Sequence, residues 1–515
     1  MSIPIIAVIL TTLAVSGAVA LTRPADRSMA IVIGGVWVLA VAIAFFAPSR
    51  MLAFLALAGL LAAAAVMSQR GAVKLYLGVI AALPISMTFV VPFPGLNYLI
   101  ILDYAKLATL TLLAPAFATA IFMRAPAGLR SVDHLLLAFV LLTGLLSFRD
   151  LPFTSVLRTI ADQLILIYVP YLTISRMLTT EKDVEEALQS VFISILILSF
   201  IAAITALRSW NYYVHLSDIG SGKAFFDFRN GFLRVGATMG PSLLAFMAGV
   251  GVAFMLRARS LKETPLMLAM ASLGVIAFAG FVTGARGGWI AAFVSVVLFY
   301  VFAYSSQTLR RLTLLGFALA LICGLYLINT ESPALQDRFG SVSYRAELIR
   351  TSFQQIADRP LFGSVDFMSS PRFRHLVQGE GIVDVVNGYL QIALYNGLVG
   401  LCLYLFAQGI AFQRGLRALS GMARFDRAAP ENASARLTLA LLLAMQAGYL
   451  ALIATISLTT FTAHYAYIIL ALVVANLRAQ STQAVAAAPS PTVNEALEAP
   501  PPSPAPYGGR FVRRR

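Results

Sequence analysis

The hydrophobic positions of this chain form long continuous runs rather than an alternating pattern. Each run is about twenty residues long, which is the length that an α-helix needs to cross the hydrocarbon core of a bilayer. Only helices or a closed barrel can span lipid, because lipid offers the backbone no hydrogen-bond partner, and unbroken apolar runs favour helices. We therefore expect an all-α fold, a polytopic membrane helix bundle of about 12–15 transmembrane helices. The expected spans are 3–21, 29–47, 51–67, 74–92, 98–123, 133–148, 159–176, 186–207, 236–256, 265–283, 287–305, 311–328, 387–413, 437–458 and 461–478.

The basic residues orient these spans, because they gather in alternate connections, such as those with Arg23 and Arg27, Arg257 and Arg259, or Arg414. Short loops rich in lysine and arginine stay in the cytoplasm, so we expect the amino terminus outside and the carboxyl terminus inside. The first run lacks the basic start of a signal peptide, although the AVA at its end resembles a cleavage site. We prefer a first membrane helix.

This topology divides the chain into four parts. Residues 1–328 form the first part of the bundle and include a periplasmic loop at 208–236. Residues 329–386 form a large periplasmic loop with a helical segment, SYRAELIRTSFQQIA, that we expect to lie on the membrane surface. Residues 387–478 complete the bundle, and the Ala- and Pro-rich tail at 479–515 is expected to be disordered in the cytoplasm.

Composition agrees with a membrane protein and narrows its chemistry. Of the 515 residues, 59% are hydrophobic and 12% are charged, whereas soluble domains carry about 25% charged residues. The net charge of +15 is spread over short loops and the tail, so it indicates topology and lipid contact rather than nucleic-acid binding. The two cysteines, Cys323 and Cys402, lie in apolar runs, which leaves no disulfide framework and no cysteine-based metal site.

Three arginines break the charge rule, because the expected topology places them on the outer face. Arg234 precedes one span, Arg286 lies in the turn TGARGG between two spans, and Arg345 lies in the large loop. Guanidinium groups offer planar paired donors and keep their charge, so they suit phosphate. Arg286 alone could equally be an interfacial anchor that snorkels to the membrane surface. Together, the three predict an anionic ligand at the outer face.

A second group of residues surrounds the start of the thirteenth span. Val386 and Asn387 are followed by nine residues, GYLQIALYN, and then by Gly397 and Gly400, while RPLFG stands upstream at 359–363. In this order and spacing, the chain resembles the O-antigen ligase and polysaccharide polymerase superfamily of bacterial inner-membrane glycosyltransferases. The resemblance covers residues 230–415 or so, about a third of the chain.

The resemblance implies roles for several residues. Arg286, Arg345 and, less directly, Arg234 would hold the pyrophosphate of an undecaprenyl-linked sugar donor. Asn387 occupies a family motif position, and Arg350 and His375 are further acceptor or loop candidates. The resemblance implies no metal and no cofactor, and no Asp-x-Asp cluster stands on the outer loops.

Val386 departs from the family pattern, which has a catalytic histidine at this position. Valine cannot accept a proton, so another base, a different mechanism or an inactive member with a scaffolding role remain open. Asp384 and His464 are the candidate general bases. Asp384 could instead complement a helix dipole, and His464 could be an interfacial histidine bonded to a carbonyl.

We expect a polymerase of undecaprenyl-pyrophosphate-linked oligosaccharide repeat units in the bacterial inner membrane, as in O-antigen or exopolysaccharide synthesis. The first alternative is an O-antigen ligase that transfers polymer to lipid A core, and the second is a transporter or flippase for such lipids. A transporter would show midplane charges and an internal repeat, whereas the sequence has few midplane charges and no obvious repeat. Chain-length regulator and flippase proteins are the expected protein partners.

Overall fold

The computed structural model describes most of the chain, with gaps in the loops and at the carboxyl end. The described residues are 2–22, 27–66, 69–123, 128–213, 216, 228–229, 231–304, 306, 308, 311–313, 315–316, 319, 341–377, 383–422 and 430–487. Most of the expected span 311–328, much of the loop 208–236, and the tail from residue 488 onward lie outside these residues.

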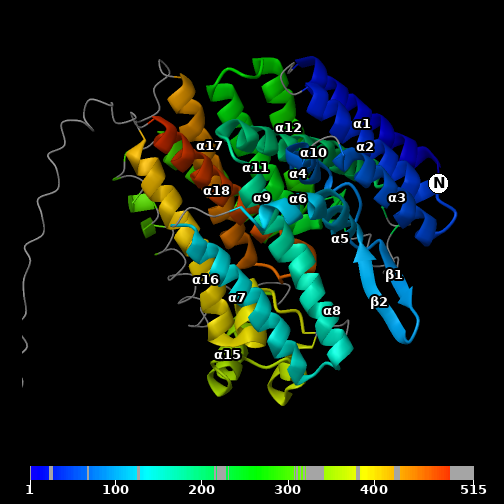
Figure 1. Ribbon diagram of the computed structural model, residues 1–515, viewed down its shortest axis with the longest axis vertical. Helices are drawn as coiled ribbons and strands as arrows, with labels where there is room; N and C mark the ends of the chain where they lie inside the picture. The colour runs from blue at the N-terminus through cyan, green and yellow to red at the C-terminus, as the bar shows by residue number, and fades with distance from the viewer. Residues whose placement is uncertain are drawn as a thin grey trace, which may run out of the picture.

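Long apolar helices make up the bulk of the molecule (Figure 1). Within the described ranges, nine helices are long and apolar enough to cross a membrane, and three shorter apolar helices accompany them. The nine are α2 (Arg27–Phe46), α7 (Arg130–Leu146) with the 3₁₀ turn η3 (Ser147–Arg149), α8 (Phe153–Gln163) continued by the π-turn η4 (Leu164–Tyr168) and α9 (Val169–Met177), α10 (Glu181–Arg208), α11 (Pro241–Ser260), α13 (Arg286–Tyr304), α16 (Gly388–Gly421), α17 (Pro430–Ile453) and α18 (Thr460–Ala487). The three are α1 (Ser2–Thr22), α3 (Arg50–Ala65) and α12 (Leu266–Val282). The predicted all-α polytopic bundle is confirmed.

One pair of expected spans is wrong, because residues 88–103 form strands instead of helix. After α4 (Gln69–Val79), β1 (Thr88–Phe93) pairs with β2 (Leu96–Asp103) in an antiparallel hairpin that projects from the bundle (Figure 1). Two prolines in VVPFPG interrupt any helix, and Gly95, with a φ of 81°, makes the turn. The short elements α5 (Tyr104–Ala108), η2 (Thr109–Leu113, a π-turn) and α6 (Ala114–Ala120) then return the chain to the bundle.

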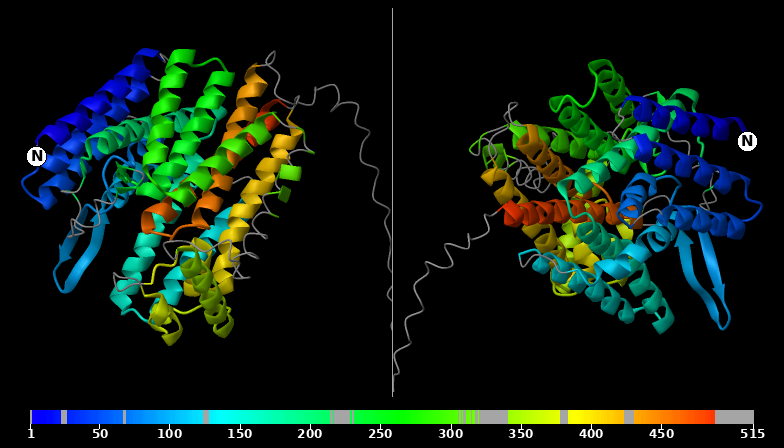
Figure 2. Two further views of the ribbon diagram at one scale, coloured as in Figure 1. Left: turned by 180° about the vertical axis from the view of Figure 1, so that it is seen from behind. Right: turned by 45° about the horizontal axis from the view of Figure 1, so that its top comes forward.

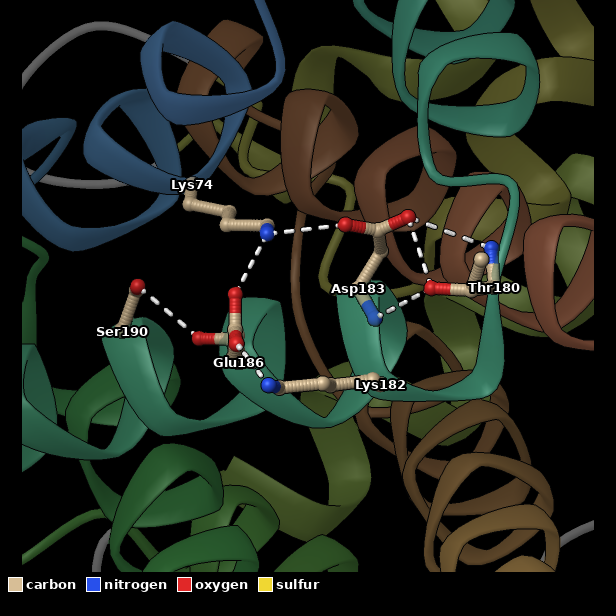
Figure 3. A network of polar contacts seen from close by, with 6 residues as sticks. All are labelled: Lys74, Thr180, Lys182, Asp183, Glu186 and Ser190. Carbon is tan, nitrogen blue, oxygen red and sulfur yellow. Dashed lines mark hydrogen bonds and ion pairs between the residues drawn. The ribbon is translucent and has the colours of Figure 1, made fainter. Parts of the chain in front are cut away.

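Ion pairs tie the helix ends together at one end of the bundle. At the start of α10, Lys74 from α4 contacts the carboxylates of Asp183 and Glu186 (Figure 3), and its nitrogen lies 2.9 Å from Asp183 Oδ1. Thr180 caps the same helix in a reciprocal capping box with Asp183. The side chains of Lys74 and Asp183 are at most 10% exposed, so each charge depends on its partner.

Further arginines connect other helices at this same end. Arg257 at the end of α11 lies 2.8 Å from Glu185 of α10, and Arg176 of α9 pairs with Asp133 of α7. Arg436 of α17 is fully buried and donates hydrogen bonds to carbonyl oxygens at the ends of α13 and α16, such as Ala303 O at 3.0 Å. These arginines therefore satisfy carbonyl groups that helix ends leave without a partner.

A helical cap covers the other end of the bundle, which we call the loop end. It consists of α15 (Ser341–Asp358) and the 3₁₀ turns η8 (Asp366–Ser369) and η9 (Pro371–Leu376). Figure 2 shows α15 beside the start of α16. Leu348 and Ile356 of α15 pack with Phe367, Phe373 and residues of α16 in a small core of their own. The apolar face of α15 therefore contacts protein rather than the membrane surface predicted for it. Phe353, on the same helix, is 59% exposed.

Helix α16 is broken at Gly397, where φ is 68° and ψ is −173°. The break frees backbone groups of α16, and the RPLFG segment pairs with them. The amides of Leu398 and Val399 donate to the carbonyl oxygens of Pro360 and Leu361 at 2.8 and 3.3 Å. In return, the amide of Ser364 donates to Leu394 O at 2.7 Å. We call this backbone pairing between residues 360–364 and 394–399 the seam.

Two glycines make the seam possible. A Cβ on Gly397 would lie 2.1 Å from the carbonyl oxygen of Leu361, and a Cβ on Gly363 would lie 2.2 Å from that of Leu394. Both glycines also have positive φ, at 68° and 65°, which other residues rarely adopt. The positions of Gly363 in RPLFG and of Gly397 in α16 are thus a requirement of backbone contact.

We predict that Gly397→Ala destabilises the protein by at least about 1–3 kcal/mol, because it combines positive-φ strain with a backbone clash. Thermal unfolding of the purified protein in detergent measures the effect. Gly409→Ala, on the same helix with no atom within 4 Å of the new Cβ, is the control and should melt no lower than the wild type. Equal melting temperatures for the two variants would contradict the role given to the seam.

Candidate functional site

The turn between α12 and α13 holds two of the predicted arginines at the loop end. Arg286 is the first residue of α13, and its side chain is exposed. The segment before α11 runs against this turn, with the amide of Val235 donating to Val282 O at 3.3 Å. Arg234 Nε donates to the carbonyl oxygen of Thr283, also at 3.3 Å. The structure therefore brings Arg234 and Arg286 to one turn, at the amino end of a 19-residue helix whose dipole favours an anion.

The connection between α17 and α18, residues 454–459, links this turn to the start of α16. A Cβ on Gly287 would lie 2.3 Å from Thr455 Oγ1, so the turn packs directly on the connection. Two residues further on, Ser457 donates a hydrogen bond to the carboxylate of Asp384. Leu458 exchanges two hydrogen bonds with the side chain of Gln391, at 2.6 and 3.3 Å. The Arg286 turn and Asp384 thus adjoin the same short segment.

Helix α15 reaches the same place from the helical cap. The hydroxyl of Tyr344 donates to the backbone carbonyl of Asp384 at 3.0 Å, and Arg345 is the next residue. The Arg345 side chain is exposed. No hydrogen bond or ion pair to a described residue involves the side chain of Arg286 or Arg345. Two exposed guanidinium groups and one partly buried carboxylate therefore lie on adjoining segments of the loop end.

The remaining loop candidates have structural contacts. Asn387 caps α16, because its side chain accepts hydrogen bonds from the amides of Tyr389 and Leu390 at 3.0 and 3.1 Å. His375 is exposed and lies 3.4 Å from Glu347 of α15. Arg350 is exposed on α15, one turn beyond Arg345.

His464 lies in the bundle interior instead of at an open surface. It is fully buried, and its ring nitrogens contact the hydroxyl of Tyr76 and the carbonyl oxygen of Leu166. A carbonyl oxygen can only accept, so Nδ1 carries the hydrogen. With both nitrogens engaged by the protein, this histidine holds α4 and η4 against α18.

Arg149 makes contacts with the seam that the sequence did not predict. Its guanidinium donates to the carbonyl oxygens of Phe362 and Gly363 at 2.9 and 3.0 Å, and to that of Tyr395 at 3.0 Å. It therefore fastens both sides of the seam to η3, at the end of α7. The signal was present, since Arg149 follows the sixth expected span on the outer face and breaks the charge rule as Arg286 does.

Polar side chains also stabilise the loop side of the seam. Ser364 Oγ donates to the carboxylate of Asp366, and Arg359 lies 3.9 Å from the same carboxylate. The hydrogen bond from Ser364 is the main reason that the pKa of Asp366 lies below its usual range. Asp366 therefore stays ionised near neutral pH.

The fold and the loop-end site define a multi-pass membrane protein that presents arginines and a carboxylate where a helical cap meets the bundle. Residues 275–405 match the family model described as O-antigen ligase. This match confirms the resemblance to the O-antigen ligase and polysaccharide polymerase superfamily, whose members are membrane glycosyltransferase-like enzymes. The matched region contains the Arg286 turn, α15, the seam and the start of α16. No curated protein matched the chain.

We predict that Arg149→Lys loosens the seam. The planar guanidinium group of arginine donates hydrogen bonds to both chain segments, and the ammonium group of lysine cannot replace it. Hydrogen exchange at the amides of Leu398 and Val399 should become at least severalfold faster. Arg158→Lys is the matched control, since Arg158 also donates to backbone carbonyls, at Tyr98 and Leu99 of the hairpin. Unchanged exchange at residues 398 and 399 in Arg149→Lys would show that Arg149 does not hold the seam.

Proposed function

We propose that this protein polymerises oligosaccharide repeat units that are linked to undecaprenyl pyrophosphate, at the periplasmic face of the bacterial inner membrane. The observation that carries the proposal is the convergence of the Arg286 turn, Arg345 and Asp384 at one end of the bundle. The family match adds the general reaction class of ligases and polymerases.

In the proposed reaction, the arginines act on the leaving group. A sugar–pyrophosphate bond breaks at the anomeric carbon, and the departing undecaprenyl pyrophosphate takes the bonding electron pair. Arg286, Arg345 and Arg234 bind the phosphate oxygens, where negative charge grows in the transition state. The backbone N–H groups at the start of α13 can donate further hydrogen bonds to these phosphate oxygens.

Asp384 is the proposed general base. The acceptor hydroxyl oxygen forms the new bond to the anomeric carbon, and its proton passes to the carboxylate of Asp384. Ser457 holds this carboxylate through one oxygen, which leaves the other oxygen to receive the proton. His464 has no free ring nitrogen and takes no part in the proposed step.

A ligase is the second candidate, because the matched family model carries that description. Val386 stands where the ligase pattern has its histidine, and this favours the polymerase. Purified protein with lipid-linked repeat units should yield a ladder of longer lipid-linked chains. Product that appears only when lipid A core is added would favour the ligase. If neither product forms, both candidate functions are refuted.

We predict that Arg286→Ala, Arg345→Ala and Asp384→Asn each lower the rate of polymer formation at least about 100-fold, as losses of transition-state stabilisers do. The readout is the polysaccharide chain-length distribution on a gel, with protein level in the membrane measured alongside. Arg259→Ala is the control, because Arg259 is an exposed arginine at the end of α11, away from the loop end. A wild-type distribution in the first three variants would refute the site.

We also predict that the reaction proceeds in EDTA, because guanidinium groups can supply the positive charge that a divalent ion would otherwise provide at the pyrophosphate. The initial rate of the purified protein should change less than twofold after chelation. Complete loss of activity, restored by adding a divalent metal, would contradict the arginine mechanism.

A further inference from the structure

A cavity of about 340 Å³ lies next to the proposed site, between α7, α8, α16 and α18. Its loop-end rim includes Arg149 and Val365, and its inner part includes Phe139, Tyr404 and Tyr467. Figure 1 shows α7 beside α16 at the loop end, with α8 next to α7. This volume is at the lower end of the range for small-molecule sites, about 300–1,000 Å³, and suits a single sugar residue.

The cavity adjoins the candidate base through one backbone segment. Gln391 and Leu458 both line it, and they are the two residues that exchange hydrogen bonds. Ser457, the residue before Leu458, holds the carboxylate of Asp384. A hydroxyl group bound in the cavity would thus be near the group that must take its proton.

Three buried polar side chains that line the cavity have no hydrogen-bond partner among the described residues. The Tyr404 hydroxyl is buried without a hydrogen bond in the described part of the chain. The Tyr467 hydroxyl and the Asn396 amide also form no hydrogen bond to a described residue. Tyr404 and Tyr467 are 3% exposed and Asn396 is 8% exposed. Buried donors and acceptors are costly to leave without partners, so the lining is suited to a ligand that carries hydroxyl groups.

The charge and shape of the lining select among ligand classes. Arg149 is the cation among the described lining residues, and three carbonyl oxygens of the seam already occupy its guanidinium. The cavity therefore does not suit a phosphate. A hydrocarbon chain would leave the hydroxyl and amide groups unpaired. A neutral sugar ring satisfies them, and its apolar face can pack on the tyrosine and phenylalanine rings.

We propose that this cavity is the acceptor subsite, which binds the terminal sugar whose hydroxyl attacks the donor. The proposal rests on the proposed function, and it divides the site into two parts. The arginine turn binds the charged donor, and the cavity binds the uncharged acceptor. The 457–458 segment, with Asp384 on Ser457 and the cavity at Leu458, connects the two.

The test uses the full chain in lipid nanodiscs and two acceptor probes, a lipid-linked repeat unit and a lipid A core oligosaccharide. The KM for each acceptor and the direct binding of each probe are measured, and so is the binding of undecaprenyl pyrophosphate. Tyr467→Phe removes one hydroxyl and should raise the acceptor KM about three- to tenfold. Ala463→Leu fills part of the cavity and should raise it more than tenfold, with unchanged binding of undecaprenyl pyrophosphate. The probe that binds more weakly to the cavity variants than to the wild type shows whether the acceptor sugar belongs to a lipid-linked repeat unit or to lipid A core.

Tyr104→Phe is the matched control, because Tyr104 is also a buried tyrosine whose hydroxyl lacks a partner in the described residues, and it lies in α5. It should behave as the wild type does. Unchanged KM and unchanged probe binding in both cavity variants would overturn the subsite. Weaker binding of undecaprenyl pyrophosphate in Ala463→Leu would overturn it in favour of the donor's hydrocarbon chain. If the wild type transfers no sugar, the proposed function fails, and loss of probe binding in Ala463→Leu still decides whether the cavity binds saccharide.

Discussion

The pairing of the backbone across the seam is the constraint on which the loop end depends. Gly397 interrupts a helix inside an apolar bundle, and each amide and carbonyl freed there needs a partner, because lipid provides none. Residues 360–364 supply these partners, and Arg149 joins both segments of the seam to the end of α7. The helical cap is thereby fixed to the bundle at the seam, which in turn fixes α15 and Asp384.

This arrangement separates two tasks that a transferase must combine. The turn at Arg286 presents positive charge at a helix start, while the cavity beside Tyr467 presents neutral hydroxyl and amide groups. The connection between α17 and α18 contacts both regions and also holds the carboxylate of Asp384. In the proposed scheme, charge recognition and sugar recognition are thus built on different helices, and the connection sets the distance between them.

The sequence predicted the helical class and the family, because apolar runs and motif spacing are local signals. It missed the hairpin at residues 88–103, because the apolar residues on either side of the two prolines and Gly95 fit a strand pair as well as a helix. It placed His464 among the bases because a polar residue at a span end resembles a site residue, whereas Tyr76 and Leu166, which engage its ring, are distant in sequence. The cavity is defined by tertiary contacts alone, whereas Arg149 had a signal in the sequence, its expected place on the outer face, that did not identify its partners.

The β1–β2 hairpin has a consequence for how deeply the protein sits in the bilayer. A two-stranded sheet has open edges, and open edges facing lipid are excluded from the hydrocarbon layer. Val90, Phe93 and Leu99 are each nearly half exposed, and Arg158 stacks on the ring of Tyr98 at 3.9 Å, a pairing suited to the headgroup zone. We therefore expect the hairpin to lie in the headgroup zone, where it would stop the bundle from sinking further into the membrane.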